Sequence, residues 1–443
     1  MIGNQLRIRR EYEMEKHSKK ESALSLFLMI VILVGVWKGP ELFQSVKSNH
    51  RVVETDTVQA AATSSDEVRA VWISFLDFES AKVDKKSEKQ FRKYVDTMFN
   101  KCVSAKLNTV IVQVRPLSDA MYSSEIFPWS KVISGKQGRN PGYDPLEYMV
   151  EAAHKRNLKI EAWLNPYRIT LSSIKFSSLS ASNPAVKWKK SSNSSERRNV
   201  LKFGGQYYYN PAKTEVRQLI IDGVREIVQN YDVDGIHFDD YFYPTLGNKY
   251  KSLFDAKEYK SYKSSCKKNG EDAKSIVAWR RENVNKLLKG VYSGIKDIDS
   301  NVKFGVSPAG NINNLYGSDR YYCDVKKWLS SDGYVDYICP QIYWSFTQPV
   351  CPYTKTLKKW CNIKKNSKID LYVGLAAYRA GISKKEARMI GDSGWGKSRK
   401  ILKKQVVTAR KLKKVSGFVL FRYDNIVSSK TKKEMKNLKS VLK

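Results

Sequence analysis

The run Asp234–Pro244 places two carboxylates, a histidine and tyrosines at the end of a short apolar stretch. Because side chains alternate along a strand, His237, Asp239 and Tyr241 share one face of it. A carboxylate buried on such a face is costly without hydrogen bonds, which indicates a working role. Glycosidases use two carboxyl groups that flank the scissile bond. We therefore predict Asp239 as nucleophile or general base, and Asp240 as the second carboxyl group if the chain turns after the strand.

A simpler interpretation stays open for both aspartates, because an Asp at this point could cap the following helix. It has more weight for Asp240 than for Asp239. Glu161, Asp119 and Asp424 are alternatives to Asp240 as the second carboxyl group, and the sequence does not give their separations. Retaining and inverting chemistry therefore both remain possible.

Polar and aromatic residues also lie in or directly after other apolar runs of the sequence. One such strand end carries little information, but several at one end of a barrel form a site. Their donors and flat rings suit a hydroxyl-rich ligand. The residues predicted to bind substrate are Arg115, Asp119, Glu161, Trp163, Asn165, Tyr167, Arg168, His237, Tyr241, Gln341, Tyr343, Trp344 and Arg422.

From residue 67 onward, eight short β-rich runs alternate with helix-like segments. Near-continuous apolar strands separated by helices indicate parallel strands buried on both faces. Eight of them predict an α/β fold, a closed (β/α)8 TIM barrel over residues 67–443. The predicted strands are Val68–Phe75, Thr109–Arg115, Leu158–Leu164, Gly235–Asp239, Lys303–Ser307, Val335–Ile342, Asp370–Leu375 and Gly417–Arg422.

Two loop insertions explain why this region exceeds the usual length of about 250 residues for such a barrel. Ile169–Phe203 follows the third predicted strand and Thr245–Asp272 follows the fourth. Both leave the end of the barrel where such enzymes keep their active sites. We expect them to form a canopy over the cleft.

The first 66 residues have a different character. Residues 1–21 form a basic tail, residues 22–38 contain the uncharged apolar run Ala23–Trp37, and residues 39–66 read as a polar linker. The apolar run is shorter than the roughly 20 residues of a typical membrane span. Because basic residues precede it, the tail should stay in the cytoplasm and the barrel should lie outside. An uncleaved single-pass anchor is favoured over a cleaved signal peptide, which would give a secreted protein.

The net charge of +35 comes from 79 basic and 44 acidic residues. Such a field attracts polyanions. Most of the basic residues are lysines spread along the whole chain, whereas nucleic-acid modules concentrate theirs on one element. We therefore expect an anionic cell wall or membrane surface nearby, and no nucleic-acid partner.

Cofactor and metal chemistry find no support in the sequence. None of the six cysteines forms a CxxC pair, and the four histidines lack metal-ligand spacing. Gly391–Ser398 matches the P-loop pattern literally, but the preceding segment reads as a helix, whereas a P-loop follows a strand. We predict no metal and no cofactor. Cysteine pairing and oligomeric state are left open.

Several segments resemble the glycosyl-hydrolase-like family ten, bacterial envelope proteins distantly related to barrel glycosidases. The resemblance implies a TIM barrel that acts on glycans, and some members are similar to enzymes that cut peptidoglycan strands. One position departs from it, because Glu161 stands where the family usually has histidine. The matching segments are Arg69–Ile73, Asn108–Tyr122, Ala162–Arg168, Tyr209–Pro211, Asp234–Pro244, Ser307–Pro308 and Pro340–Trp344.

The fourth strand is also similar to those of two other barrel families. In α-amylase-like enzymes the nucleophilic aspartate follows Asp-Gly with the spacing of Asp239 after Asp234. In chitinase-like enzymes an acidic residue stands where this chain has Tyr241, so the substrate-assisted chitinase mechanism lacks its general acid here.

The sequence thus predicts a glycoside hydrolase that cleaves bacterial cell-wall glycan, with peptidoglycan strands as first candidate. The alternative is an inactive barrel that binds cell-wall polysaccharide. Two carboxyl groups at the barrel mouth favour the enzyme, whereas an Asp239 locked in a salt bridge with Arg115 favours the binder.

Overall fold

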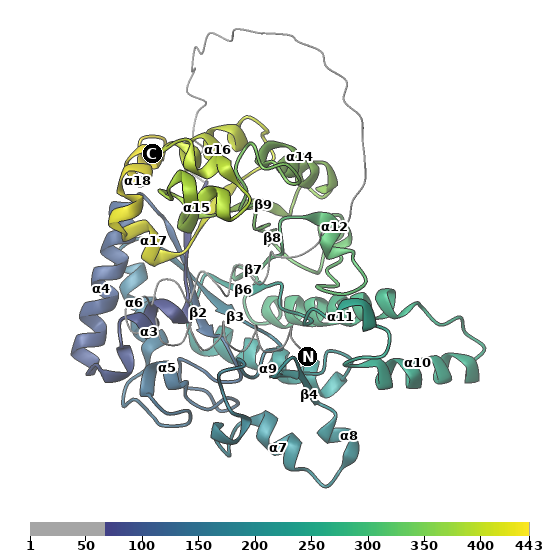
Figure 1. Ribbon diagram of the computed structural model, residues 1–443. Coiled ribbons are helices and arrows are strands. Elements are labelled where there is room, and N and C mark those ends of the chain that lie inside the picture. The colour runs from purple at the N-terminus through teal and green to yellow at the C-terminus, as the bar shows by residue number, and fades with distance from the viewer. Residues whose placement is uncertain (1–66, 443) are drawn as a thin grey trace, which may run out of the picture. The chain divides into compact units, whose positions relative to one another are not determined.

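The computed structural model describes residues 67–442. In this part of the chain eight parallel strands close into a barrel in the order β1-β10-β9-β8-β7-β6-β3-β2, with helices packed around them (Figure 1). The predicted (β/α)8 fold is confirmed. The strands are β1 (Val68–Ile73), β2 (Thr109–Arg115), β3 (Lys159–Leu164), β6 (Gly235–Asp239), β7 (Lys303–Ser307), β8 (Tyr337–Ile338), β9 (Asp370–Leu375) and β10 (Gly417–Phe421).

A helix follows each strand and returns the chain to the amino end of the barrel, as parallel neighbours require. The apolar faces of these helices pack on the outer faces of the strands in one continuous core. These helices are α4 (Glu88–Ser104), α6 (Pro145–His154), α9 (Thr214–Asn230), α11 (Ile276–Lys296), α13 (Val325–Trp328), α14 (Tyr353–Ile363), α16 (Ile401–Arg410) and α18 (Lys432–Lys439).

Strand alternation divides the buried residues into two layers. On β3, Ile160 and Ala162 face the helices, whereas Trp163 joins a second cluster inside the barrel. Glu161 shares the inward face with Trp163. Carboxylates, amides and aromatic rings on the inner face therefore stack along the barrel axis toward its mouth.

Strand β8 is much shorter than the predicted Val335–Ile342 and is regular only at Tyr337–Ile338. Pro340 has no N–H to donate to a neighbouring strand. Pairing resumes beyond it only as isolated bridges from Gln341 to Ala309 and Gly374. The interruption turns the chain outward at the mouth, next to the loop after β7.

Both insertions leave the carboxyl ends of barrel strands, as predicted. The first contains α7 (Pro184–Lys190), α8 (Ser194–Arg197) and β4 (Val200–Phe203), which pairs with β5 (Gln206–Tyr209). The second contains α10 (Ala256–Lys268), which extends away from the barrel beside α11 (Figure 1).

A bidentate ion pair between Arg198 and Glu258, with N–O distances of 2.7 and 2.6 Å, joins the two insertions to each other. Asn183 joins the first insertion to the loop after β2, at Ser118. In residues 67–442 no hydrogen bond or ion pair links either insertion to Asp239 or Asp240. The insertions therefore extend the rim, and a canopy over the carboxylates stays a prediction.

The two ends of the described chain meet at Arg410, at the end of α16. Its guanidinium forms a bidentate ion pair with Glu67, both N–O distances being 2.8 Å, and also donates to the carbonyl oxygen of Val441. Glu67 directly precedes β1. The ion pair therefore lies at the amino ends of the strands.

The predicted basic tail (1–21), membrane segment (22–38) and linker (39–66) lie outside the described residues. Among residues 67–442, no helix has the length and apolar character needed to cross a membrane. All six cysteines lie within this part of the chain, buried and with free thiols. The Gly391–Ser398 segment is preceded by helix α15 (Lys384–Met389), as predicted, so it lacks the strand of a P-loop.

Candidate active site

Asp239 ends β6 at the barrel mouth with only 3% of its surface exposed. Its Oδ2 accepts hydrogen bonds from Asn165 Nδ2 at 2.5 Å and from Trp163 Nε1 at 3.3 Å. Its Oδ1 accepts from the backbone N–H of Tyr241 at 3.2 Å. Donors on three sides favour the ionised carboxylate.

A chain of amides fixes the orientation of Asn165. Gln113 Nε2 donates to Asn165 Oδ1 at 2.6 Å, and Gln113 Oε1 accepts from the backbone N–H of Phe75 at 3.1 Å. A backbone N–H can only donate, so both side-chain amides have one possible orientation. The Asn165 NH2 group must therefore face Asp239.

Asp240 points toward the opposite neighbour. The chain bends at Asp240, and Asp240 Oδ2 accepts from the backbone N–H of Ala309 at 2.7 Å, just beyond β7. Asp239 is thus held from β3 and Asp240 from β7, and the turn that a two-carboxylate site requires is present. Neither residue caps a helix, because the next helical element, η3 (Gly247–Lys249), begins later and has Leu246 as its cap. The capping interpretation is wrong.

The two carboxyl groups differ in their electrostatic surroundings. Burial raises the pKa of Asp239 to about 6, against the opposing effects of the Arg168 charge and the hydrogen bonds that it accepts. Burial together with the charge of Asp239 raises the pKa of Asp240 to about 7. Asp240 is therefore the member of the pair that holds a proton more readily, and Asp239 the one that ionises first. Coupled groups of this kind titrate as a pair.

Arg168 lies beside this pair. Its guanidinium stacks 3.9 Å from the centre of the Tyr241 ring, and its Nε has no hydrogen-bond partner within residues 67–442. Its charge opposes the rise in pKa of both aspartates. Arg168 thus favours negative charge at the mouth without forming an ion pair there.

The rim beyond the carboxylates is aromatic. Tyr343 and Trp344 follow β8 and are half-buried, and Tyr343 packs between Tyr378 and Phe421. Gln341 donates through Nε2 to the carbonyl oxygen of Ser307 at 2.9 Å. Half-exposed flat rings next to fixed polar groups suit the faces and hydroxyl groups of sugars.

His237 lies one layer deeper and is fully buried. Trp72 Nε1 donates to His237 Nε2 at 3.1 Å, so this nitrogen carries no proton. The proton is therefore on Nδ1, which donates to the Tyr337 hydroxyl at 2.7 Å. Burial lowers the pKa of His237 to about 3, which keeps the ring neutral. His237 supports the floor of the site as a neutral residue.

Arg115 does not lie at the mouth, and its predicted contact with substrate is wrong. A register irregularity at the end of β2 turns it outward, where its guanidinium stacks 4.3 Å from the centre of the Phe127 ring. Gly223 of α9 makes room, since a Cβ there would lie 3.2 Å from Arg115 Nη1. Within the described chain Arg115 forms no ion pair with Asp239, so the lock expected of a binder is absent there.

Four other residues predicted to contact substrate are held in contacts with the protein itself. Asp119 is buried in the loop after β2, where Gln137 donates to it at 3.4 Å. Tyr167 lies in the core against Phe242. Arg422, predicted to bind substrate, is held by Asp77 at 2.7 Å and Asp424 at 2.8 Å. Asp424, an alternative second carboxyl group, is thus an ion-pair partner of Arg422. Glu161 lies below the mouth inside the barrel, where Tyr337 donates to it.

The comparison with protein families decides between the related barrel families. Residues 67–390 match the family described as glycosyl hydrolase-like 10. The chain belongs to this family. The match includes both aspartates and ends before β10.

Two relatives extend the glycosyl hydrolase-like 10 match. The chain is 39% identical to glycosyl hydrolase YngK of Bacillus subtilis (strain 168) over 343 residues, which cover 72% of this chain and 62% of that protein. It is 36% identical to glycosyl hydrolase DigH of Escherichia coli (strain K12) over 349 residues, 75% and 76% of the two chains. The chain thus spans less than two thirds of YngK and about three quarters of DigH.

Solved structures agree on the fold. The glycoside hydrolase domain of PgaB (BpsB) from Bordetella bronchiseptica superposes with a TM-score of 0.51 at 12% identity, covering 85% of this chain and 99% of that one. The endo-1,4-beta-mannanase of Rhizomucor miehei gives 0.50 at 11% identity, covering 86% and 96%. At such identities the likeness establishes the barrel alone.

In this glycosyl hydrolase-like 10 protein, a buried carboxyl group lies beneath the floor of the site. His237 Nδ1 donates a hydrogen bond to the Tyr337 hydroxyl, and this hydroxyl donates a hydrogen bond to the Glu161 carboxyl group. Glu161 is therefore the last acceptor in this chain of hydrogen bonds. Burial raises the pKa of Glu161 to about 7. The Glu161 side chain is therefore linked to His237 through Tyr337.

Sequence reasoning missed several residues that position the pair. Gln113, Ser307 and the Ala309 backbone hold the carboxylates or His237, and two of these lie at strand ends already known to be polar. Nothing in the sequence around Tyr321 indicates that it lies close to Asp240. It adopts a left-handed φ of 62°, and the charges of Asp240 and Tyr241 add to burial in raising its pKa.

Among the described residues, no group of three or more histidine, cysteine or acidic side chains is arranged to hold a metal ion. The absence of a metal and a cofactor from the reaction stays a prediction.

Proposed function

We propose that the protein hydrolyses glycosidic bonds in bacterial cell-wall glycan, with peptidoglycan strands as the first candidate substrate. The observation that carries the proposal is the pair Asp239 and Asp240, held from the two strands that flank β6 and differing in the pKa of their carboxyl groups. Glycoside hydrolysis needs one carboxyl group of each kind.

In the proposed reaction Asp240 gives its proton to the leaving oxygen as the glycosidic bond breaks. Asp239 either attacks the anomeric carbon or takes a proton from the attacking water. In the first case water then releases the sugar and returns a proton to Asp240. In the second case Asp239 ends protonated and Asp240 ionised, so a proton passes from Asp239 to Asp240 through solvent before the next turnover. In both cases one water is consumed.

Three features support the choice of substrate class. The rim offers half-exposed aromatic rings beside fixed amides. The net charge of +35 suits an anionic envelope. The relatives YngK and DigH are both described as glycosyl hydrolases.

Incubation with purified sacculi, with and without prior removal of the peptides, tests the proposal. We expect soluble saccharides with new reducing ends, which mass spectrometry identifies together with the bond that was cut. The Asp239→Asn variant is the matched control and should release none. Tight binding of sacculi by the unmodified protein without any cleavage contradicts hydrolysis and supports a binding barrel.

We also propose that residues 22–38 anchor the protein in the cell membrane and that the barrel lies on the extracytoplasmic side. The basic residues before this apolar segment support this orientation. Protease treatment of spheroplasts should degrade the barrel. A barrel that is degraded only after membrane lysis contradicts the proposed side.

A further inference from the structure

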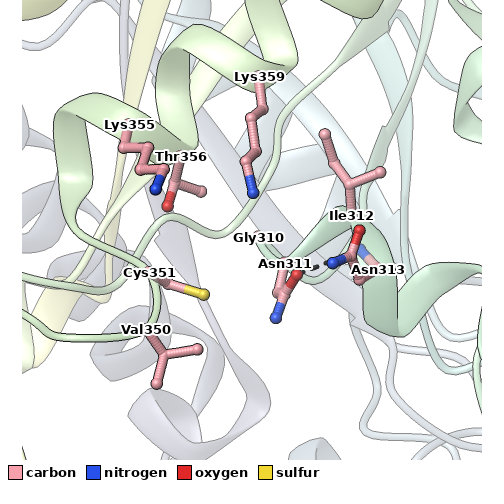
Figure 2. Close-up of a pocket in the computed structure, with 9 residues that line it drawn as sticks. All are labelled: Gly310, Asn311, Ile312, Asn313, Val350, Cys351, Lys355, Thr356 and Lys359. Carbon is pink, nitrogen blue, oxygen red and sulfur yellow. Dashed lines mark hydrogen bonds between the residues drawn. The ribbon is translucent and has the colours of Figure 1, made fainter. Parts of the chain in front are cut away.

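A recess next to the reacting pair is lined by cationic and amide side chains. Its volume is about 70 Å³, far below the roughly 300–1,000 Å³ of sites that enclose whole small molecules. It has room for a few waters or one small substituent. The lining residues are Gly310, Asn311, Ile312, Asn313, Val350, Cys351, Lys355, Thr356 and Lys359 (Figure 2).

The recess carries a concentrated positive charge. Lys355 and Lys359 lie on successive turns of α14, and Figure 2 shows the Lys359 amine directed into the recess toward Asn311. Within residues 67–442 neither lysine forms an ion pair, and no carboxylate lines the recess. The side chains of Asn311 and Thr356 add neutral donors.

The recess is rigidly connected to the reacting pair. Ala309, whose N–H binds Asp240, is directly followed by Gly310 at the wall of the recess. Trp360 of α14 donates through Nε1 to the Gly310 carbonyl oxygen at 2.8 Å, so the helix that carries the lysines is fixed to this segment.

Gly310 also permits the close contact of the loops after β7 and β8. A Cβ at this position would lie 2.4 Å from the Gln341 carbonyl oxygen and 2.8 Å from the Trp344 ring. The backbone that carries the two lysines is thus fixed relative to the aromatic rim and Asp240, as a subsite for one glycan chain requires.

We propose that this recess is a subsite for an oxyanion substituent, a carboxylate or a phosphate, carried by the glycan chain that the neighbouring pair cleaves. The inference rests on the proposed function for its substrate. Two ammonium groups and neutral donors around a space of this size match one such group. The exposed Val350 at the edge can contact the apolar part of the same substituent.

Equilibrium binding to the full chain carrying Asp239→Asn tests the subsite without hydrolysis. The probes are an oligosaccharide of N-acetylglucosamine and muramic acid with free carboxylates, the same oligosaccharide with its carboxyl groups reduced to alcohols, and one carrying a phosphate instead. We expect the carboxylate or the phosphate form to bind about tenfold tighter than the reduced form, the size of one charge-assisted hydrogen bond. The tighter of the two identifies the substituent.

A double variant, Lys355→Met with Lys359→Met, should abolish this preference and leave binding of the reduced oligosaccharide unchanged. Lys358→Met is the matched control, because Lys358 lies on the same helix, is exposed and does not line the recess. Near-ultraviolet circular dichroism checks that each variant is folded.

Equal affinity for charged and reduced forms overturns the subsite, as does an equal loss in the Lys358→Met control. A charge preference found in a protein that never cleaves glycan keeps the subsite and contradicts the hydrolase. Cleavage of glycan without a charge preference contradicts the subsite and keeps the hydrolase.

Discussion

Asn165 Nδ2 lies 2.5 Å from Asp239 Oδ2, and the orientation of this amide is fixed from behind by Gln113. The contact gives Asp239 a neutral donor that stabilises its ionised form. Asp239 is therefore kept as a base or nucleophile although it is buried.

The variant Asn165→Asp tests this contact. It replaces the donor by a second carboxylate at hydrogen-bonding distance, and two carboxylates so close cannot both ionise readily. We expect the pKa of Asp239 to rise and the acidic limb of the kcat/KM profile to move to higher pH. Asn165→Ala removes the donor without adding a charge, so it should shift the limb less. Identical profiles for the two variants contradict the role of the amide.

Asp239→Asn should abolish hydrolysis and keep the fold. An amide can neither attack the anomeric carbon nor act as an effective base, so we expect a loss of about three powers of ten or more, near 4 kcal/mol in the barrier. Turnover of sacculi measures the rate and thermal melting measures the fold. Full activity in the folded variant removes Asp239 from the reaction, and an unfolded variant indicates a structural role.

The pH profile of kcat/KM should be bell-shaped, with its maximum between about 6 and 7. The acidic limb reports ionisation of Asp239, whose pKa is raised to about 6, and the alkaline limb reports loss of the Asp240 proton, with a pKa raised to about 7. Asp240→Asn should slow the reaction most for poor leaving groups and remove the alkaline limb. An alkaline limb that persists in this variant assigns the proton to another group.

Asp240→Asn should also stabilise the protein at high pH. The raised pKa means that the fold prefers the neutral carboxyl, so stability is fully present below about pH 4 and is lost as the pH rises through about 7. The Asn side chain is neutral throughout and keeps an acceptor for the Ala309 N–H. We expect a gain on the order of 1–3 kcal/mol at pH 8 and none at pH 4.

Thermal melting at both pH values measures the difference, and Asp272→Asn, at an exposed aspartate, is the control. A gain of equal size at pH 4 and pH 8 contradicts the electrostatic explanation.

His237→Gln should weaken the acid sensitivity of the fold. The pKa of His237 is lowered to about 3, so its contribution to stability is present above about pH 6.5 and is lost as the pH falls toward 3. Glutamine can accept from Trp72 and donate to Tyr337 but does not titrate. Melting temperatures between pH 7 and pH 4 should fall less steeply in the variant, and parallel curves are the contrary result.

The sequence alone predicts the eight barrel strands and the importance of the run Asp234–Pro244. Alternation along β6 determines which side chains of this run face the inside of the barrel. The sequence could not place Arg115, since the register irregularity at the end of β2 depends on space left by Gly223 more than a hundred residues later. Pro340, which has no N–H to donate, explains why β8 does not continue to Ile342.

Other predictions failed because the contacts that decide them join residues far apart in the sequence. Arg422 looked like a donor for sugar, but Asp77, far away in the chain, neutralises it. Gln113 positions Asn165 and thereby Asp239, and only the closed barrel brings β2 and β3 into that contact. Polar strand ends thus locate a site, whereas tertiary contacts decide which of its residues face the substrate.

The contacts of Arg410 determine where the barrel can be attached to a support or fused to another protein. One guanidinium binds Glu67 and the Val441 carbonyl oxygen, so both ends of the described chain leave from the face opposite to Asp239. A surface support or a fusion partner joined at either end therefore leaves the mouth open to a polymer as large as a sacculus. The closeness of the two ends also makes the barrel a good candidate for circular permutation, with new termini opened in an exposed loop.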